Sequence, residues 1–440
     1  MTTIVSGRFD LDEGWTLAKY EETGGYQALR AALDRGPGDI AEEVKAASLL
    51  GRGGAGFPAG TKWGFLPPGK HPYYVVVNGD ESEPGTYKDR MLMERDPHQL
   101  IEGILICCYA VGARQAFLYV RGEMALAQER LAGALNDAYD KGYVGRSILD
   151  TDFSVDIVLH WGAGAYIVGE ETGLIESLEG RRGMPRLKPP YFPAAIGLYG
   201  QPTIVNNVET LANLPWIVMN GGQAFADIGA ETSRGTRLFA VSGHVNRPGV
   251  YEVDFGTTTY RQLIDDHAGG VRDGHQLKCF IPGGASAPWF LDEHLDLALE
   301  TGVVGEAGSM MGSGAVVVMD ETTDAVRACL RMVRFFADES CGKCTPCREG
   351  TGWLEKILDR IVEGRGRPSD LDLLVDVCDN ISPGLAWPPR MTTICPLGPS
   401  AVSPVMSALR HFRGEFEDYI DRAEPPELAG MPGVRVEISA

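Results

Sequence analysis

The sequence predicts three consecutive domains: an α/β domain with a largely parallel sheet, a small β-rich domain and an all-α domain. Three patterns support this prediction. Short β-branched runs alternate with helical segments in residues 1–235, strands and turns dominate residues 236–324, and a helical period runs through residues 325–425, ahead of a tail at 426–440. A chain of 440 residues is long enough for each domain to bury its own core.

In the first domain three β-branched runs are expected as strands, namely Tyr74–Val77, Ala116–Arg121 and Val155–His160. Each is followed by a turn that contains glycine and then by a helix-like segment, such as Met124–Tyr139. Strands that alternate with helices are typical of a largely parallel sheet covered by helices.

The second domain begins after the polar stretch Gly229–Gly235, where the pattern changes. Arg237–Val245 and Val250–Val253 flank an Asn-Arg-Pro-Gly turn and predict a hairpin. A short helix and two further strands are expected after it, at Tyr260–His267, Leu277–Ile281 and Ala315–Met319.

The third domain is predicted from apolar residues at helical spacing. Val326, Cys329, Leu330 and Val333 lie three, four and seven positions from the first. Further helices are expected at Trp353–Ile361, Leu371–Ile381 and Val402–Phe412.

Charge and hydropathy exclude some classes of function. The 60 acidic and 40 basic residues give a net charge of -20, which argues against a nucleic-acid partner. The longest apolar run, Gly103–Ala113, is far short of the roughly 20 residues that span a bilayer. The first fourteen residues have neither a basic segment nor an apolar one that would resemble a signal peptide, so a cytoplasmic location is expected.

Three cysteines lie within seven residues, at Cys341, Cys344 and Cys347. This spacing favours an iron–sulfur cluster, because a four-cysteine zinc site usually consists of two separated Cys-x-x-Cys pairs. Cys378 and Cys395 are the nearby candidates for a fourth ligand.

Cys378 falls on the apolar stripe of a predicted helix, where a role as a small buried side chain is sufficient. Cys395 lies in a loop rich in proline and glycine and is the preferred ligand. The four remaining cysteines belong to apolar segments and are expected in the core: Cys107, Cys108, Cys279 and Cys329.

A glycine-rich loop, Gly51–Gly56, matches the spacing G-x-G-x-x-G. It follows a helical stretch, Ile40–Leu50, and not a strand, so the ordinary dinucleotide-binding interpretation fails. Its exposed N–H groups, with Arg52 in the loop and Lys62 shortly after it, would suit a phosphate or a flat ring. Glycine-rich surface turns are common, so the loop alone is weak support.

Two loops at the expected carboxyl ends of strands, Asn78–Gly85 and Gly162–Thr172, combine glycines with polar side chains. Open α/β sheets bind ligands at this edge. Purely structural roles also stay open for the acids in these loops. Glu170 and Glu171 would suit the first turn of a helix, and Asp80 and Glu83 would suit solvated loop positions.

Six segments and Cys395, in this order, closely resemble the NADH-binding flavoprotein subunit of bacterial respiratory complex I. The segments are GRGGAGFPAGTKW, NGDESEPGTYKDR, GAYIVGEETGLIESLEG, RLKPP, PTIVNNVET and SCGKCTPCREG. The resemblance implies a Rossmann-like FMN domain, a β-grasp, ubiquitin-like soluble-ligand-binding domain and a C-terminal helical bundle around one [4Fe-4S] cluster. It implies Cys341, Cys344, Cys347 and Cys395 as the cluster ligands.

The resemblance also implies which residues contact the flavin and the substrate. The FMN contacts carry over to Gly51, Arg52, Gly53, Gly54, Lys62, Asn78, Asp80, Glu81, Ser82, Tyr166, Gly169, Glu170, Val205, Asn206, Asn207 and Thr210. The NADH contacts carry over to Gly54, Phe57, Phe65, Glu83, Glu171, Lys188 and Tyr191. Where the family reads KPPFPA this chain has an extra aromatic residue, so Tyr191 or Phe192 would stack on adenine, and we choose Tyr191. The stretch between Cys347 and Cys395 is longer than usual.

The activity implied by the resemblance is NADH oxidation by hydride transfer to FMN, followed by single-electron transfer to the cluster and on to quinone. No side chain is expected to act as nucleophile or general base; Glu83 and Glu171 would position the substrate. The implied partners are a thioredoxin-like [2Fe-2S] subunit and a large multi-cluster iron–sulfur subunit. Membrane contact is expected only through the assembled complex, on the cytoplasmic side of the inner membrane.

Two alternatives are kept. The first is a diaphorase subunit of a soluble NAD-linked hydrogenase or formate dehydrogenase. Such subunits often carry extra ferredoxin-like segments, whereas this chain has no cysteine before Cys107 or after Cys395, which favours complex I. The second is a non-catalytic module with a ligand in the β-rich domain and a structural metal in the helical one.

The acids of the two loops suggest one further hypothesis. Asp80, Glu81, Glu83, Glu170 and Glu171 would disfavour an added 2'-phosphate and so select NADH over NADPH.

Overall fold

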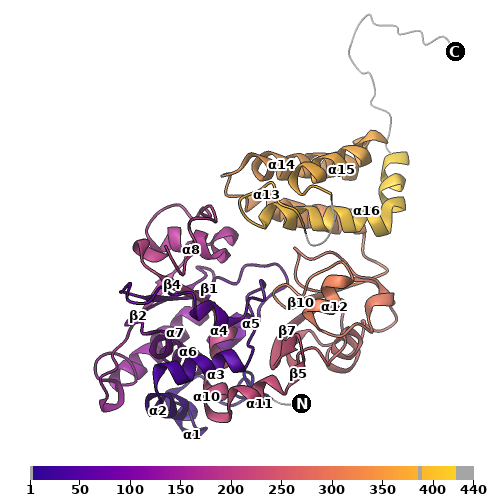
Figure 1. The fold of residues 1–440 in the computed structure, drawn as a ribbon. Helices are drawn as coiled ribbons and strands as arrows, with labels where there is room; N and C mark the ends of the chain where they lie inside the picture. The colour runs from indigo at the N-terminus through magenta and orange to yellow at the C-terminus, as the bar shows by residue number, and fades with distance from the viewer. Residues whose placement is uncertain (1–2, 385–388, 423–440) are drawn as a thin grey trace, which may run out of the picture.

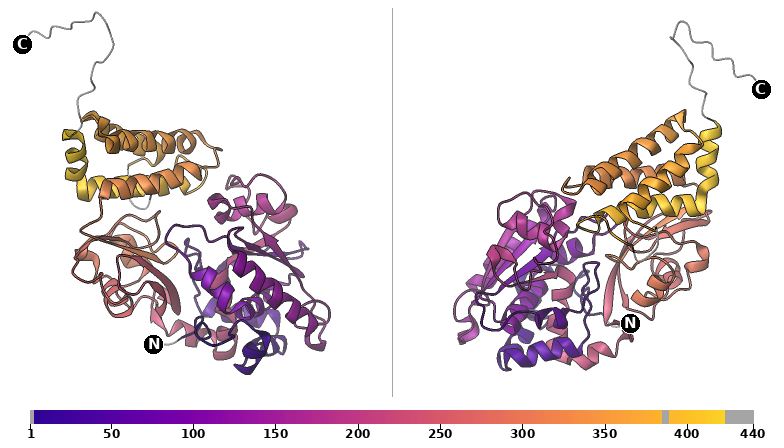
Figure 2. Two further views of the ribbon diagram at one scale, coloured as in Figure 1. Left: turned by 180° about the vertical axis from the view of Figure 1, so that it is seen from behind. Right: turned by 45° about the horizontal axis from the view of Figure 1, so that its top comes forward.

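The computed structural model describes residues 3–384 and 389–422. It shows a mixed α/β part, a β-rich part beside it, and a helical part that lies across both (Figures 1 and 2). Among the described residues no helix combines the length and the apolar character needed to cross a membrane.

The first part is built on a four-stranded parallel sheet of order β3-β2-β1-β4. Its strands are β1 (Tyr74–Gly79), β2 (Gln115–Val120), β3 (Asp156–Trp161) and β4 (Thr203–Asn207). The three β-branched runs that predicted strands overlap β1, β2 and β3, with Arg121 and Val155 one residue outside β2 and β3. The valines of β1 are fully buried, because both faces of this sheet are covered.

Helices and short helical turns surround this sheet. They are α1 (Leu17–Glu22), α2 (Gln27–Leu33), α3 (Pro37–Ala46), α4 (Ala59–Trp63), α5 (Lys88–Arg95), α6 (Pro97–Val111), α7 (Ala125–Asp140), η1 (Ile148–Asp150), η2 (Tyr166–Gly169), α8 (Glu171–Leu178), η3 (Leu198–Gly200), α9 (Val208–Ala212), α10 (Leu214–Asn220) and α11 (Gly222–Ala226). Val75 and Val77 pack in one core with α6 and α7, whereas Val76 packs on the opposite face with α8.

The second part holds a mixed four-stranded sheet of order β8-β7-β10-β9. The predicted hairpin is present as β7 (Thr236–Gly243) and β8 (Gly249–Asp254), and the two later strands are β9 (Leu277–Ile281) and β10 (Ala315–Asp320). β10 runs parallel to β7 and antiparallel to β9. The remaining elements are β5 (Gly229–Ala230), β6 (Ser233–Arg234), η4 (Gln262–His267), η5 (Asp292–His294) and α12 (Thr301–Glu306).

The polar stretch Gly229–Gly235 contains a small antiparallel ribbon, in which β5 pairs with β6. One local expectation for this part needs correction. The short helix expected at Tyr260–His267 is a wide π-helical turn over Gln262–His267.

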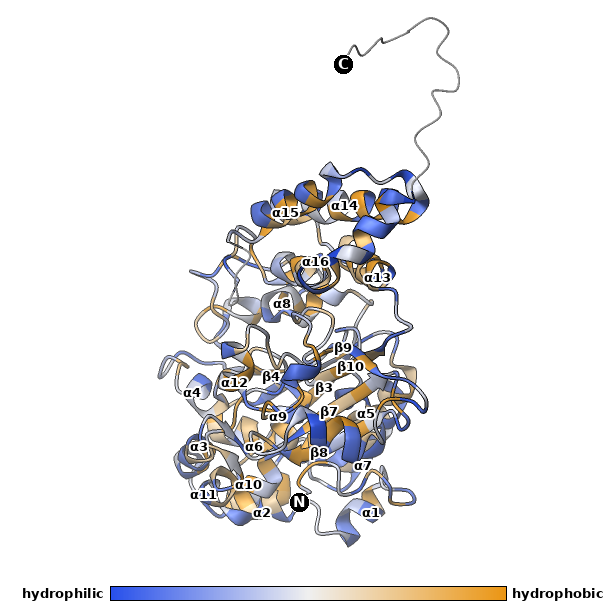
Figure 3. Ribbon diagram, turned by 90° about the vertical axis from the view of Figure 1, so that its right-hand side faces the viewer, coloured by the Kyte–Doolittle hydropathy of each residue, from blue (hydrophilic) through white to orange (hydrophobic). Residues whose placement is uncertain are grey.

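The third part contains α13 (Ala325–Asp338), α14 (Thr345–Arg360), η6 (Ile361–Arg365), α15 (Ser369–Ile381) and α16 (Leu397–Asp421). Asp324 caps α13 by accepting a hydrogen bond from the backbone N–H of Arg327. α16 changes direction at Phe412, whose backbone is not helical. These helices have separate polar and apolar faces (Figure 3), and their apolar residues form one core that reaches Trp289 of the second part.

Candidate functional site

Loops from several strands meet at the carboxyl edge of the parallel sheet. The amide of Asn78, at the end of β1, donates a hydrogen bond of 2.9 Å to the carbonyl of Gly169 in η2. A Cβ on Gly53 would lie 3.1 Å from the Cβ of Asn207, at the end of β4. The glycine loop, the β1 loop, η2 and β4 therefore converge at the edge where such sheets bind ligands.

The glycine loop is closed by a hydrogen bond of 2.9 Å from the N–H of Gly51 to the carbonyl of Phe57. It follows α3 and not a strand, as the sequence predicted. Gly54 and Gly56 have φ of 124° and 66°, a conformation that other residues adopt at a cost. The loop thus presents backbone to the site without side chains in the way.

Arg52 has a place that its sequence context did not indicate. Its guanidinium is fully buried and donates to the carbonyls of Arg234 (2.7 Å) and Thr236 (2.8 Å), over the ring of Phe255. Burial lowers the pKa of Arg52 to about 9. The guanidinium therefore contacts the second part of the chain. This corrects the expectation that the Arg52 side chain assists a phosphate beside the glycine loop. A flavin contact of Arg52 would use its backbone.

The acids of the β1 loop are not solvated. Asp80 is buried; its Oδ2 accepts a hydrogen bond of 2.7 Å from Ser82, and its Oδ1 has no partner among the described residues. Burial raises the pKa of Asp80 to about 7. Glu83 accepts hydrogen bonds from the hydroxyl of Tyr166 (2.7 Å) and the backbone N–H of Ser286 (2.7 Å).

Glu81 caps α5. Its two carboxylate oxygens accept hydrogen bonds from the backbone N–H groups of Asp89 (2.8 Å) and Arg90 (2.9 Å). Burial, with Asp89 close by, raises the pKa of Glu81 to about 8. A flavin contact of Glu81 would also have to use its backbone.

Glu170 and Glu171 have different surroundings. Glu170 is the N-cap of α8, since its Oε2 accepts from the N–H groups of Thr172 (2.8 Å) and Gly173 (3.0 Å). The other oxygen, Oε1, pairs with Lys188 at 2.7 Å. The predicted role at the helix terminus is thus confirmed for Glu170. Its second carboxylate oxygen forms the ion pair with Lys188.

Glu171 lies between two lysines. Its Oε1 is 2.8 Å from Lys188 Nζ and its Oε2 is 3.4 Å from Lys62 Nζ. Lys62 also donates to the carbonyl of Val205 at 3.1 Å. Although burial opposes ionisation, the two lysines hold the pKa of Glu171 below its usual value.

Most polar side chains at the end of β4 and the start of α9 already have hydrogen-bond partners within the chain. Asn207 caps α9 through its Oδ1, and its Nδ2 donates to Asp89 at 2.6 Å. The Thr210 hydroxyl accepts from the N–H of Arg52 at 2.9 Å. Asn206 is buried, and its amide makes one weak contact, to Cys107 Sγ at 3.7 Å.

Four large apolar side chains near this edge are exposed. Phe57 and Phe65 are 44% and 57% exposed, with their ring centres 5.8 Å apart. Tyr191 and Phe192 are exposed to a similar degree, and the guanidinium of Arg186 lies 5.9 Å from the Tyr191 ring centre. Exposed aromatic rings of this kind are suited to stacking on a flat ligand.

The nine cysteines lie in different surroundings. Cys341, Cys344, Cys347 and Cys395 belong to one cluster of packed residues, with Cys344 at the N-cap of α14. Burial raises the pKa of Cys347 to about 11 and that of Cys395 to about 12, and neighbouring cysteines of the set add to both shifts. Cys378 lies instead in the helical core beside Cys329. Cys107, Cys108, Cys279 and Cys329 are buried, as expected.

These residues fit the groups that the sequence implied. A convergent set of four thiols is the donor set of a cubane cluster. At the sheet edge, the unpaired Asp80 Oδ1 is an acceptor for a ligand hydroxyl, and the glycine loop leaves room for close approach of a ring or phosphate.

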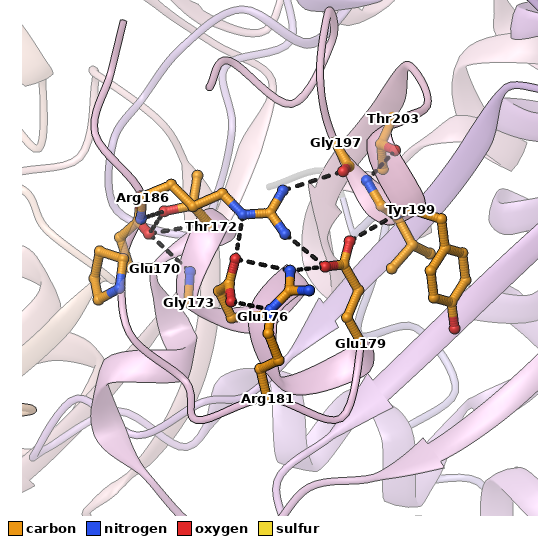
Figure 4. A network of polar contacts seen from close by, with 12 residues as sticks. Glu170, Thr172, Gly173, Glu176, Glu179, Arg181, Arg186, Gly197, Tyr199 and Thr203 are labelled. Carbon is orange, nitrogen blue, oxygen red and sulfur yellow. Dashed lines mark hydrogen bonds and ion pairs between the residues drawn. The ribbon is translucent and has the colours of Figure 1, made fainter. Parts of the chain in front are cut away.

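Two groups of site residues were missed from the sequence. Lys88, Asp89 and Glu209 form a buried ion cluster next to Asn207. Arg181 and Arg186 share Glu176 and Glu179 (Figure 4), and both arginines belong to the loop that carries Lys188. The motifs TYKDR, NNVET and RLKPP contain Lys88, Glu209 and Arg186, but nothing local shows which charges become buried.

Family models match all three parts of the chain. Residues 44–216 match the Nuo51 FMN-binding domain, residues 237–318 the SLBB domain, and residues 327–419 the NADH-ubiquinone oxidoreductase-F iron-sulfur binding region. An FMN-binding domain and an iron–sulfur region on one chain define an oxidoreductase flavoprotein subunit.

Full-length relatives narrow this class. The F subunit of NADH-quinone oxidoreductase from Mycobacterium tuberculosis is 51% identical over 429 residues, which cover 96% of this chain and 94% of the relative. The F subunit from Streptomyces coelicolor is 51% identical over 421 residues, covering 96% and 91%. The chain therefore belongs to the family of NADH-quinone oxidoreductase F subunits. The family's groups are FMN and one [4Fe-4S] cluster, with NADH as the substrate.

A solved structure resembles the whole fold. The crystal structure of an NAD+-reducing [NiFe]-hydrogenase in the H2-reduced state superposes with a TM-score of 0.80 at 35% identity, covering 93% of this chain and 67% of that one. The same architecture therefore occurs in a protein of the alternative class considered from the sequence.

Proposed function

We propose that this chain oxidises NADH at the carboxyl edge of the parallel sheet and passes the electrons to its own [4Fe-4S] cluster within a respiratory complex I. One observation carries the proposal: the thiol set and the flavin-site loops pack together. The ring centres of Tyr166 and of Phe335 on α13 are 5.1 Å apart, and the backbone N–H of Tyr166 donates to Glu339 at 2.9 Å. Cys341 follows two residues after Glu339, so the acceptor site borders the donor site.

The flavin would be held by the residues that the resemblance assigned. The geometry indicates which of them would contact it through the backbone and which through the side chain. Gly51, Arg52, Gly53, Gly54 and Glu81 would contribute backbone. The other side chains of the set are Lys62, Asn78, Asp80, Ser82, Tyr166, Glu170, Asn206, Asn207 and Thr210, beside Gly169 and Val205. When bound, FMN would accept one hydride, which carries two electrons, from NADH and would release the electrons one at a time, as an iron–sulfur acceptor requires.

The substrate would be oriented by stacking and by charge. Phe57, Phe65 and Tyr191 would cover its rings and exclude water, while Gly54, Glu83, Glu171 and Lys188 fix its polar groups. No side chain would need to act as a general base, because bound FMN would itself accept the hydride.

The finer architecture and surroundings belong to this proposal. We assign residues 1–235 to a Rossmann-like FMN domain, 236–324 to a β-grasp, ubiquitin-like domain, 325–425 to a helical bundle with Cys341, Cys344, Cys347 and Cys395 as ligands, and 426–440 to a tail. Residues 423–440 lie outside the described part of the chain. The partners would be a thioredoxin-like [2Fe-2S] subunit and a large multi-cluster subunit, on the cytoplasmic side of the inner membrane. Identity of 51% to complex I subunits, against 35% to the hydrogenase chain, favours complex I over the diaphorase alternative.

The purified full chain tests the activity. We expect flavin absorbance in the blue, about four irons per chain, and NADH-driven reduction of ferricyanide. Purification of the native assembly should recover iron–sulfur partner subunits. A colourless protein containing zinc would contradict the proposal, and co-purification with a hydrogenase or formate dehydrogenase would support the diaphorase alternative.

A further inference from the structure

The loop that carries Lys188 and Tyr191 needs anchors from outside itself. Residues 181–197, all within the described part of the chain, form neither helix nor strand. At Arg186 the backbone N–H donates to the hydroxyl of Thr172 on α8, at 2.8 Å. The conformation of the loop thus depends on side chains that attach it to α8.

Arg186 uses all three nitrogens of its guanidinium for this purpose (Figure 4). Nε binds Glu176, Nη2 binds Glu179 at 2.8 Å, and Nη1 donates to the carbonyl of Gly197 at 3.1 Å. Glu176 and Glu179 belong to the C-terminal end of α8, and Gly197 is at the far end of the loop. One side chain therefore fastens the two halves of the loop to each other and to the helix.

These contacts are sheltered from solvent. The Arg186 side chain is 11% exposed, and that of Glu179 is 6% exposed. Charge-assisted, forked hydrogen bonds are strongest and most directional in such surroundings. Glu179 also accepts from the N–H of Tyr199 at 2.7 Å, which extends the same network into η3.

Arg186 lies two residues before Lys188, which reaches the opposite end of α8. Lys188 pairs there with Glu170 and Glu171. The helix is thus bound at its C-terminal end by Arg186 and at its N-terminal end by Lys188, with Tyr191 following. By fixing the backbone at this point, Arg186 determines the direction from which the Lys188 and Tyr191 side chains project.

We infer that Arg186 is a positioning residue for NADH: it holds the 181–197 loop in the conformation in which Lys188 and Tyr191 can meet the substrate. This inference rests on the proposed function, which places those two residues in the substrate site. If the loop spends only a tenth of the time in the competent conformation, apparent affinity falls about ten-fold. The hydride-transfer step itself is unaffected once substrate is bound.

Arg181 provides a matched control. It binds the same two carboxylates, Glu176 and Glu179, but is 56% exposed and lies at the start of the loop. Among the described residues its contacts do not extend to Gly197. Arg181→Gln therefore removes one positive charge from the same pair of acids without releasing the far end of the loop.

The test is steady-state NADH:ferricyanide kinetics of the full chain carrying its FMN and cluster. For Arg186→Gln we expect KM for NADH to rise about ten-fold, kcat to stay within about two-fold, and FMN content to match wild type. Arg186→Lys, which restores the charge without the fork, should recover only part of KM, and Arg181→Gln should stay within about two-fold of wild type. An unchanged KM in Arg186→Gln, an equal rise in Arg181→Gln, or loss of FMN from both Arg186 variants would overturn the inference.

Lys188→Gln and Tyr191→Ala separate this inference from the proposed site. If both raise KM and Arg186→Gln does not, the positioning role is wrong while the substrate site stands. If neither raises KM although the protein oxidises NADH, the assignment of the loop to the substrate site fails, and the inference fails with it.

Discussion

Glu171 is held between Lys188, at 2.8 Å, and Lys62, at 3.4 Å, at the carboxyl edge of the sheet. The two lysines keep this carboxylate ionised but offset its charge. Glu81 and Glu170 are likewise occupied with the N-termini of α5 and α8. The acidity of the site is therefore weaker than a count of five acids suggests. Glu171, the carboxylate between the two lysines, is the acid on which we test the selectivity hypothesis.

The preference for NADH over NADPH should depend on Glu171. A 2'-phosphate near this carboxylate would be repelled, and one lost charge at close range corresponds to roughly 1–2 kcal/mol. In Glu171→Gln the ratio of kcat/KM for NADH to that for NADPH should fall by about ten-fold. Kinetics with both donors measure the ratio. Glu129→Gln, at an exposed position of α7, controls for net charge. An unchanged ratio in Glu171→Gln would sink the hypothesis.

Replacement of each cysteine by alanine should distinguish the role of Cys395 from that of Cys378. Cys395→Ala should keep FMN and NADH oxidation by ferricyanide but lose iron and electron transfer to the rest of the assembly, because a cubane needs four ligands. Cys378→Ala removes a small buried side chain from the helical core and should cost about 1 kcal/mol of stability with iron retained. Iron content and NADH:quinone activity of the assembly check both. Iron loss in Cys378→Ala alone would reverse the assignment.

The sequence predicted the elements whose signals are local. The β-branched runs at Tyr74, Ala116 and Val155 became β1, β2 and β3, because periodicity and turn residues act within a few positions. The hairpin β7–β8 followed from its turn in the same way. The division between Cys378 and Cys395 also followed from local context, an apolar helical stripe against a proline-rich loop.

What the sequence could not predict depends on distant partners. The glycine-rich context of Arg52 suggests an exposed cation. Its guanidinium is instead buried, where it donates to carbonyls about 180 positions away in the sequence. Glu81 caps a helix that begins seven residues later. The role of Arg186 depends on Glu176, Glu179 and Gly197 meeting in space, and no single motif contains all four.

Loss of Lys88 should destabilise the first part strongly. Its Nζ lies 2.7 Å from both Asp89 and Glu209, and all three side chains are buried. Although burial disfavours the charged form, these acids hold the pKa of Lys88 above its usual value. Lys88→Met leaves the carboxylates of Asp89 and Glu209 buried without a cation, which should lower the free energy of unfolding by about 3–5 kcal/mol. The melting temperature of the first part should fall by roughly 10 °C.

Two variants check the origin of that loss. Lys45→Met removes an exposed lysine that pairs with Glu42 and should cost under about 1 kcal/mol. Adding Glu209→Gln to Lys88→Met should recover part of the transition temperature, because one unpaired charge is removed. Purely additive losses in the double variant would show that packing, not charge, is responsible.

FMN binding should depend on pH through Asp80. Burial raises its pKa to about 7, so the protein without flavin gains stability from protonated Asp80 at low pH and loses it as pH rises through 7. A flavin hydroxyl that donates to the unpaired Oδ1 favours the ionised form. About one-tenth of Asp80 is ionised at pH 6 and nearly all at pH 8. Affinity for FMN should therefore be about ten-fold higher at pH 8.

Fluorescence titration of the flavin-depleted protein with FMN measures this dependence. The flavin phosphate also titrates near this range, so the comparison must be with Asp80→Asn, which keeps the ligand's titration and removes that of the side chain. The variant should bind more weakly at pH 8 and lose most of the pH dependence. If wild type and Asp80→Asn show the same slope between pH 6 and 8, Asp80 does not bind the flavin as a carboxylate, and its raised pKa reflects burial alone.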